Sequence, residues 1–388
     1  MQHDGYTLSE YNTDNKDDNK LDKSNNSSAL RAAKKCSEFA LAKFPSLLEF
    51  LGYTFCFSTC LVGPSFEFSH YLSACDGSLH YITIAEKDGT KAKRLRGKSI
   101  PSNLLPTLLP LLKCIGLIFF ASIFDRYCNY RRLVTPWFFE LTAKQRFFYN
   151  WITNFIQRLK VYFTWSFAEG ANNLWYAGFD GYDRETGQAK GFTTACGAEI
   201  WNVETCESIR QGTKAWNKKT SQWLLRYVYI RNKSRLGIVY AVSAIWHGFY
   251  PGYYMLASMV WLISQCERLG RAKISPYFSE KKWSLYSIAC MLSIHSVGGC
   301  YATTAFFLRS WENVMDNWRA HHFCGHIVCV VFYLAVSQLP TPQLKQKHLG
   351  TTLIHEKKRD TNVPALQSET SSQGTHDLDM LKLERKHS

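Results

Sequence analysis

A single histidine, His247, stands in the middle of segment 236–264, whose other residues are apolar, aromatic or small. Gly248 follows it directly, and Pro251 comes four residues later. An imidazole at hydrocarbon depth is costly, so a histidine in these surroundings is a candidate for a functional site. The alternative, from the residue alone, is a core histidine whose ring bonds to a neighbouring carbonyl group.

A second polar residue, Asn217, precedes this histidine by thirty positions and opens a basic, aromatic stretch that ends near Arg231. An isolated asparagine of this kind is more often a helix cap than a catalyst. Together, the two residues meet a simple chemical need, because an imidazole can take a proton from a hydroxyl group while an amide holds a reactant in place. His295, in another apolar run, has no such partner and ranks below His247.

The elements that must position these residues are apolar segments. About twenty apolar residues are enough for a helix to cross the core of a bilayer. Segment 147–167 is amphipathic instead, and predicts a helix that lies in the interface or lines a polar cavity. We therefore predict an all-α, multi-span integral membrane protein with roughly six to eight membrane helices. The apolar segments are 44–68, 104–124, 236–264, 283–308 and 322–339.

The mean hydropathy of −0.22 conceals how unevenly the polar residues are distributed. Residues 1–43 hold seven acids and seven bases and are expected to be disordered, and 341–388 form a polar tail with eight bases and six acids. The membrane domain, 44–340, holds 31 bases against 18 acids, so it carries most of the net charge of +15. This charge suits an anionic ligand or anionic lipid heads. No nucleic-acid-binding motif accompanies it, which argues against a nucleic-acid partner.

The cysteines and histidines give little indication of a metal site. The 13 cysteines are scattered without a CxxC pair, which is typical of small buried residues rather than of disulfides or a zinc site. A cluster at 321–326 combines three histidines with Cys324, but its side chains fall on incompatible helix faces. No metal is expected.

Four stretches, in this order along the chain, resemble the signature of the membrane-bound O-acyltransferase family and, within it, the lysophospholipid acyltransferase branch. The resemblance covers about 45–339. The stretches are the apolar segment 45–68, YFTWSFAEG at 162–170 running on to GFDG at 178–181, Trp216-Asn217 with Trp223, Leu224 and Tyr229, and SAIWHGFYPGYY at 243–254.

This resemblance implies a helical bundle around an intramembrane chamber, in a multi-pass protein of the endoplasmic reticulum membrane. Acyl-CoA would enter the chamber from the cytosolic side as a co-substrate, and a lysophospholipid would enter from the bilayer. The family's catalytic pair carries over to His247 and Asn217. No permanently bound cofactor is expected.

Residues around this pair are candidates for substrate binding. Basic side chains suit the phosphates of CoA, although a solvated, positive cytosolic face explains them equally well. The aromatic side chains are expected to shape the chamber rather than take part in the chemistry. The candidates are Trp216, Lys218, Lys219, Arg226, Arg231, Trp246 and Tyr250.

Two alternatives stay open. The first keeps the reaction and changes the acceptor to a sterol, a diacylglycerol or a peptide. The second is a truncated, non-catalytic membrane protein, because family members have several spanning helices before the stretch that matches residue 45, where this chain has the polar segment 1–43. Head group, acyl-chain preference and oligomeric state are not predicted.

Overall fold

The computed structural model describes most of the chain between 36 and 340. The predicted polar tail 341–388 and nearly all of the predicted polar segment 1–43 lie outside the described residues. For 82–96 the backbone alone is considered. The described residues are 36, 39–41, 43–60, 66–85, 92–96, 99–183, 186–232, 235–278 and 285–340.

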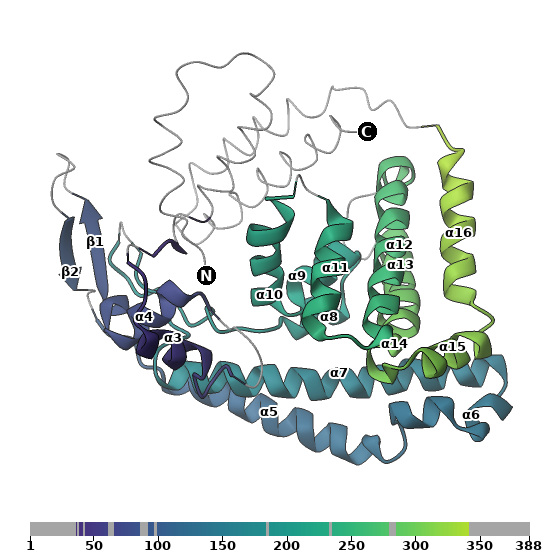
Figure 1. Ribbon diagram of the computed structural model, residues 1–388, viewed down its shortest axis with the longest axis horizontal. Coiled ribbons are helices and arrows are strands. Elements are labelled where there is room, and N and C mark those ends of the chain that lie inside the picture. Colours follow the sequence, from purple (N-terminus) through teal and green to yellow (C-terminus); the bar gives the residue numbers. More distant parts are fainter. Residues whose placement is uncertain are drawn as a thin grey trace. The chain divides into compact units, whose positions relative to one another are not determined.

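Two long helices, α5 (Leu104–Asp125) and α7 (Ala143–Leu174), pack along each other (Figure 1). The outer face of α5 is lined with exposed leucine, isoleucine and phenylalanine side chains, while small residues such as Cys114 and Ala121 are buried. Gly170 of α7 lies so close to α5 that an added Cβ would be 2.8 Å from Leu111. An apolar outer face with small residues at the helix contact is typical of membrane helices.

The polar side of α7 faces inward. A capping box between Thr142 and Gln145 starts this helix of 32 residues. Asn154 and Arg158 are buried, whereas Phe148 is exposed. The amphipathic helix predicted at 147–167 is therefore confirmed, and its polar side packs against the neighbouring helices of the protein.

The other elements precede, separate or follow this pair in the chain. Those in the first part of the chain are α3 (Leu47–Thr54), α4 (Phe68–Cys75), the 3₁₀-helix η2 (Ser78–His80), the strands β1 (Tyr81–Ala85) and β2 (Ala92–Arg96), the 3₁₀-helix η3 (Tyr130–Val134) and α6 (Pro136–Glu140). Those after α7 are α8 (Ile200–Glu204), α9 (Ile209–Ala215), α10 (Lys218–Leu224), the π-helix η4 (Leu225–Tyr229), α11 (Leu236–His247), α12 (Pro251–Lys273), the 3₁₀-helix η5 (Ser275–Tyr277), α13 (Leu285–Ser293), the π-helix η6 (Ile294–Ala302), α14 (Thr304–Leu308), α15 (Trp311–Ala320) and α16 (Cys324–Ser337).

The fold is predominantly helical, as predicted, but the all-α class needs one correction. Strands β1 and β2 form an antiparallel hairpin in which Tyr81 lies opposite Arg96. Tyr-Ile-Thr-Ile, which opens β1, is rich in aromatic and β-branched residues that favour strands.

Fewer helices than predicted are long and apolar enough to cross a membrane. Within the described residues, Leu104–Val134 and Leu285–Leu308 meet this criterion, and α15 with α16, bent by 70°, make a third if they count as one span. The predicted six to eight is too high by this measure. Within segment 44–68 the structure describes α3, a helix of 8 residues, and α4 begins only at its last residue, while segment 236–264 is divided after His247.

Two clusters of buried residues join the helices. The larger one connects α12 with η6, α14, α15 and α16 through residues such as Met259, Tyr301 and Trp318. The smaller one connects α5, α7 and α8 through Ala121, Ile156 and Val203. The helices that carry His247 and Asn217 are attached to these two clusters, as described next.

Candidate active site

Asn217 and His247 lie at the same end of a helical hairpin. Helix α10 continues directly into η4, and the two together contain as many residues as α11, which returns alongside η4. Figure 1 shows α10 and α11 in the same part of the fold, and the contact between the two arms is made by η4. Because the arms are equally long, the residue before the first arm and the last residue of the second arm come to the same end. The spacing of thirty residues between Asn217 and His247 therefore corresponds to the two arms of the hairpin and the connection between them.

His247 is the last residue of α11, and aromatic rings orient its imidazole. Its ring centroid is 5.1 Å from that of Phe306 in α14 and 5.7 Å from that of Tyr253 in α12. The side chain is exposed, and its nitrogen atoms form no hydrogen bond with any residue that the structure describes. The alternative of a core histidine bonded to a carbonyl group is therefore wrong. A helix C-terminus also favours the positive charge that an imidazole acquires when it takes a proton.

Two glycines and a proline define the turn after His247. Gly248 ends α11 with φ of 119°, a conformation that L side chains rarely adopt. Pro251 occupies the first turn of α12. Gly252 donates its backbone N–H to the Arg309 carbonyl at 2.7 Å, and an added Cβ would be 2.2 Å from the Ala305 carbonyl oxygen. Hence α12 begins in direct contact with the end of α14, which also contributes Phe306.

Asn217 has an unusual backbone conformation, and its side chain makes no hydrogen bond with the residues that the structure describes. Its φ and ψ of 46° and 53° are left-handed, which asparagine tolerates better than most residues. It occupies the N-cap position of α10, yet its side chain makes no capping hydrogen bond. The helix-cap interpretation therefore explains the position of Asn217 but leaves its amide group unused.

Trp216 attaches this end of the hairpin to α7. Its ring packs at 5.5 Å from Tyr162 and at 4.8 Å from Trp165, both of which belong to the long helix. Of the candidate substrate-binding residues, Trp216 thus packs between helices, as expected for an aromatic side chain that shapes the site.

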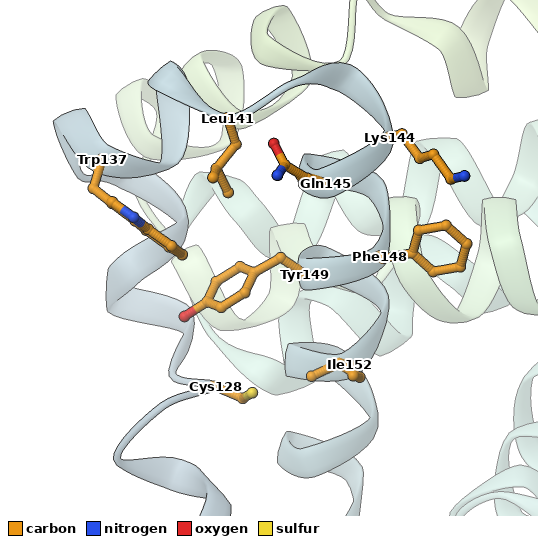
Figure 2. Close-up of a pocket in the computed structure, with 8 residues that line it drawn as sticks. All are labelled: Cys128, Trp137, Leu141, Lys144, Gln145, Phe148, Tyr149 and Ile152. Carbon is orange, nitrogen blue, oxygen red and sulfur yellow. The ribbon is translucent and has the colours of Figure 1, made fainter.

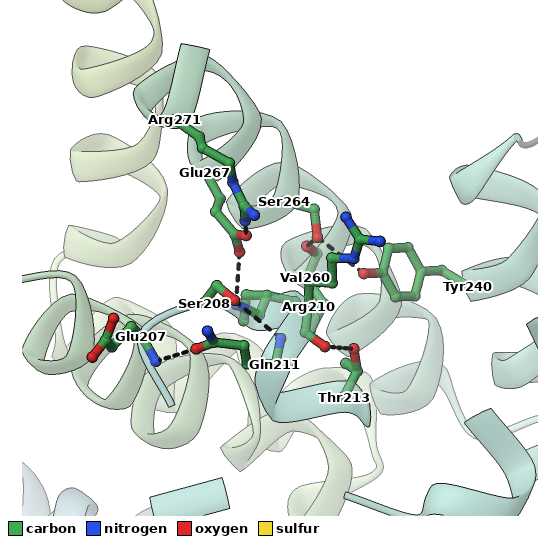
Figure 3. A network of polar contacts seen from close by, with 11 residues as sticks. Glu207, Ser208, Arg210, Gln211, Thr213, Tyr240, Val260, Ser264, Glu267 and Arg271 are labelled. Atoms are coloured by element: carbon green, nitrogen blue, oxygen red, sulfur yellow. Dashed lines mark hydrogen bonds and ion pairs between the residues drawn. The ribbon is translucent and has the colours of Figure 1, made fainter. Parts of the chain in front are cut away.

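A polar network, shown in Figure 3, connects α9 and α11 to α12. The Glu267 carboxylate of α12 accepts the Ile209 backbone N–H at 2.6 Å, at the start of α9. The hydroxyl groups of Tyr240 in α11 and Ser264 in α12 are 2.9 Å apart. Because α9 leads directly into Trp216 and Asn217, this network holds Asn217 and His247 in a defined relation. The sequence analysis missed it, although a glutamate in the helix after an apolar run was a usable signal.

Two of the basic candidates are paired with carboxylates. Lys218 forms an ion pair with Glu199, and this hydrogen bond holds the pKa of the Glu199 carboxyl below its usual value. Arg226 forms an ion pair with Glu67, and its guanidinium lies 4.5 Å from the centre of the Phe39 ring. Both charges are therefore largely compensated within the protein.

Lys219 differs from its neighbours because it forms no ion pair within the described residues. Burial lowers the pKa of the Lys219 ammonium, and the nearby positive charge of Lys218 lowers it further. Arg231 is exposed, and its guanidinium lies 5.6 Å from the centre of the Tyr227 ring. Of the four basic candidates, Lys219 is the one that lies near Asn217, is partly buried and forms no ion pair within the described residues, although the Asp180 carboxylate acts on it electrostatically.

Trp246 and Tyr250 flank the histidine, and each is about half exposed, at 51% and 54%. The Trp246 ring lies 5.2 Å from the His247 ring, and the Arg309 guanidinium lies 5.7 Å from the Tyr250 ring centre. The pocket that the structure describes is formed by residues 128–152, at the start of α7, and includes none of these side chains.

A buried polar cluster on α7 was not predicted. Arg158 donates two hydrogen bonds to Glu204 of α8, each of 2.9 Å, and one of the same length to the Gly299 carbonyl of η6. Tyr162 donates to Glu204 at 2.6 Å. His295, also in η6, has a buried Nε2 atom without a hydrogen-bond partner. No group of three or more His, Cys, Asp or Glu side chains in the described part of the chain is placed to hold a metal ion.

The fold and the site define a class of protein, a mainly helical membrane protein with an exposed histidine and an asparagine at one end of a helical hairpin, neither of whose side chains bonds to the described residues. The sequence matches the profile of the membrane-bound O-acyltransferase family over residues 2–308. The chain therefore belongs to the membrane-bound O-acyltransferase family, and the predicted family is confirmed.

Relatives with assigned names come from animals and fungi. The chain is 28% identical over 328 residues to "Membrane-bound glycerophospholipid O-acyltransferase 2" of Homo sapiens, covering 83% of this chain and 62% of the relative. It is 26% identical over 308 residues to "Lysophospholipid acyltransferase" of Saccharomyces cerevisiae, covering 74% and 49%. The protein of the same name from Schizosaccharomyces pombe is 28% identical over 365 residues, covering 89% and 67%. The chain thus spans about half to two thirds of the length of these relatives.

Proposed function

We propose that this protein is a lysophospholipid acyltransferase that moves a fatty acyl group from acyl-CoA to the free hydroxyl group of a lysophospholipid. Membership of the family supports O-acyl transfer, and the names of the relatives support a phospholipid acceptor. The observation that carries the proposal is the hairpin of α10, η4 and α11, which brings an unpaired imidazole and an unpaired amide to the same end.

His247 acts as the general base in this proposal. An imidazole has an unperturbed pKa of about 6.5 and is mostly neutral at pH 7. It takes the proton of the lysophospholipid hydroxyl as that oxygen attacks the thioester carbonyl carbon. The carbon–sulfur bond then breaks, and the imidazolium returns the proton to the departing thiolate, which leaves as CoA. The products are the diacyl phospholipid and free CoA, and no acyl-enzyme is required.

Asn217 acts on the oxygen of the thioester carbonyl. Its side-chain N–H groups are free to donate to this oxygen while it carries negative charge in the tetrahedral intermediate. The left-handed backbone at Asn217, supported by Trp216 on α7, holds the amide in place before the substrate arrives. Pre-positioned donors of this kind cost little reorganisation during the reaction.

The basic residues serve acyl-CoA. Lys219 is the first choice for a phosphate contact because it forms no ion pair within the described residues, whereas Lys218 and Arg226 have carboxylate partners. Arg231 lies further along the same basic stretch, after η4. Acyl-CoA is then a cytosolic co-substrate, the lysophospholipid comes from the bilayer of the endoplasmic reticulum, and the chamber between the helices receives both.

The test is acyl transfer by the full chain in microsomes, measured as CoA release and as labelled phospholipid. We expect His247→Ala to reduce the rate at least about 100-fold, since positioned acid–base catalysis contributes roughly 10²–10⁴. His295→Gln is the matched control, because it changes the other histidine of an apolar helix, and it should retain most of the activity.

Undiminished transfer by His247→Ala would remove His247 from the role of base. A panel of acceptors tests the substrate class: faster transfer to a sterol, a diacylglycerol or a peptide than to lysophospholipids would replace the proposed acceptor. Absence of CoA release by the wild-type chain with every acceptor would favour the non-catalytic alternative.

A further inference from the structure

A pocket of about 440 Å³ lies at the start of α7, beside α6 (Figure 2). This volume falls within the range of about 300–1,000 Å³ that is usual for pockets that bind small molecules. Its walls are mainly apolar and aromatic, and include Trp137, Leu141, Phe148 and Ile152. Such walls suit a hydrocarbon chain.

Local sequence signals build this pocket. Pro136 starts α6, and the capping box of Thr142 with Gln145 starts α7 three residues after α6 ends. The rings of Trp137 and Tyr149 meet edge to face at 5.0 Å between the two helices. Lys144 and Phe148 follow each other at a spacing of four residues, so they lie on one side of α7, as Figure 2 shows.

The polar surroundings of the pocket are basic. Lys144 is exposed and belongs to the lining. Within the described residues, the nearby Arg126, Arg131 and Arg132 form no ion pair, whereas the acidic Asp125 is engaged by Lys160. Arg132 lies close enough to act electrostatically on Tyr149 and on Cys128, two further residues of the lining. Glu140 of α6, which precedes Leu141 of the lining, adds one negative charge, so basic side chains still outnumber acidic ones beside this apolar pocket.

The pocket also lies at the end of a membrane helix. It follows the apolar part of the candidate span Leu104–Val134, in a segment that contains Tyr127 and Trp137. Tyrosine, tryptophan and basic residues together are typical of the level at which lipid head groups meet the hydrocarbon core. The surrounding medium at this level therefore presents both acyl chains and phosphates to the pocket.

We propose that this pocket binds a single phospholipid with an anionic head group, whose acyl chain contacts Phe148 and Ile152 and whose head group contacts Lys144 and Arg132. This lipid is separate from the substrates of His247, and the inference does not depend on acyl transfer. Bound there, the lipid would hold α6 against the start of α7 and so support the corner between the two long helices.

The test uses the full chain, purified in detergent and equilibrated with equal amounts of phosphatidylglycerol and phosphatidylcholine. Native mass spectrometry counts the phospholipid that stays bound and reports its class. We expect one retained phospholipid, with phosphatidylglycerol preferred at least about fivefold, since one basic side chain near anionic lipid contributes about that factor. Equal retention of the two lipids by the wild-type chain would overturn the proposal.

Three variants separate the two parts of the site. Arg132→Gln with Lys144→Gln should abolish the preference for phosphatidylglycerol, and Ile152→Trp, which fills the pocket, should reduce retention of both lipids. Lys190→Gln removes an exposed lysine elsewhere and should change neither. An unchanged preference in the double variant contradicts the proposed head-group contacts, and unchanged retention in Ile152→Trp contradicts the proposed cavity. If Ile152→Trp does not fold, the lipid preference of the double variant still tests the proposal. Arg132 and Lys144 form no ion pair within the described residues, so replacing them should not prevent folding.

Discussion

The cluster around Arg158 and the pair of Asn217 and His247 use polar side chains in opposite ways. Arg158 is buried, and its guanidinium has partners on both sides, in Glu204 and in the Gly299 carbonyl. The side chains of Asn217 and His247 make no hydrogen bond with the residues that the structure describes. Polar atoms that are already satisfied stabilise the fold, whereas polar atoms that are accessible and unsatisfied can bind a substrate.

This difference follows from the cost of burial. A buried charge without a partner is strongly unfavourable, so α7 can carry Arg158 inward only because Glu204 and η6 meet it there. An exposed polar group has water as its partner and exchanges it for a substrate at little cost. The two regions should therefore respond differently to mutation, one in stability and the other in activity.

The largest effect on stability is expected for Arg158→Leu. It leaves the partly buried Glu204 carboxylate without its cation, and the loss should approach the value of about 3–5 kcal/mol in the free energy of unfolding that is usual for breaking a buried pair. The measurement is denaturation of the full chain in micelles. The control is Arg319→Leu, which breaks an exposed ion pair with Asp316 and should cost less than about 1 kcal/mol.

A double variant sharpens this comparison. Arg158→Leu with Glu204→Leu removes both charges and should be less destabilised than Arg158→Leu alone, because no unpaired charge stays buried. Equal destabilisation by Arg158→Leu and Arg319→Leu would mean that burial does not distinguish the two ion pairs.

A smaller effect, on activity alone, is expected for Asn217→Gly. Glycine adopts the left-handed conformation of this position without strain, so the substitution removes the amide and preserves the backbone. Loss of one donor to the developing oxyanion should lower kcat about 100-fold. The free energy of unfolding should stay the same, which a denaturation curve of the same preparation checks.

Asn217→Ala is the matched variant that tests the left-handed backbone conformation of this position. It should lose the same activity and also about 1 kcal/mol of stability, since alanine is strained in the left-handed conformation. If Asn217→Gly retains full activity, Asn217 belongs with the structural residues, and the proposed pair is reduced to His247.

The smallest effect is expected for Lys219→Gln. Loss of this positive charge should raise the KM for acyl-CoA roughly tenfold, with kcat nearly unchanged, as expected for one charge-assisted hydrogen bond to a phosphate. Burial lowers the pKa of Lys219, and only the protonated form attracts the phosphate. The KM of the wild-type chain should therefore begin to rise at a lower pH than it would with an ordinary lysine.

Lys219→Arg tests this pH dependence, because arginine stays protonated. It should keep the low KM and lose the rise with pH. A KM that is the same in the wild-type chain and in Lys219→Gln would assign the phosphate contact elsewhere, with Arg231 as the next candidate.

Local patterns predicted much of the fold. Apolar length predicted α5, and the amphipathic pattern of 147–167 predicted a helix within α7. Fewer of the described helices than predicted are long and apolar enough to be spans, because apolar length does not reveal where a helix breaks. The hairpin of β1 and β2 was missed because a segment with six bases reads as a loop, although its first strand begins Tyr-Ile-Thr-Ile.

The sequence by itself determined that His247 is a lone imidazole in an apolar segment and that a basic, aromatic stretch follows Asn217. Only the tertiary structure decided that α11 ends at His247, that both residues come to the same end of one hairpin, and that Lys218 and Arg226 have carboxylate partners while Lys219 has no ion pair within the described residues. The physical reason is range: a local sequence pattern records only neighbours within a few turns. The partner of a charge comes from far along the chain, as Glu67 does for Arg226.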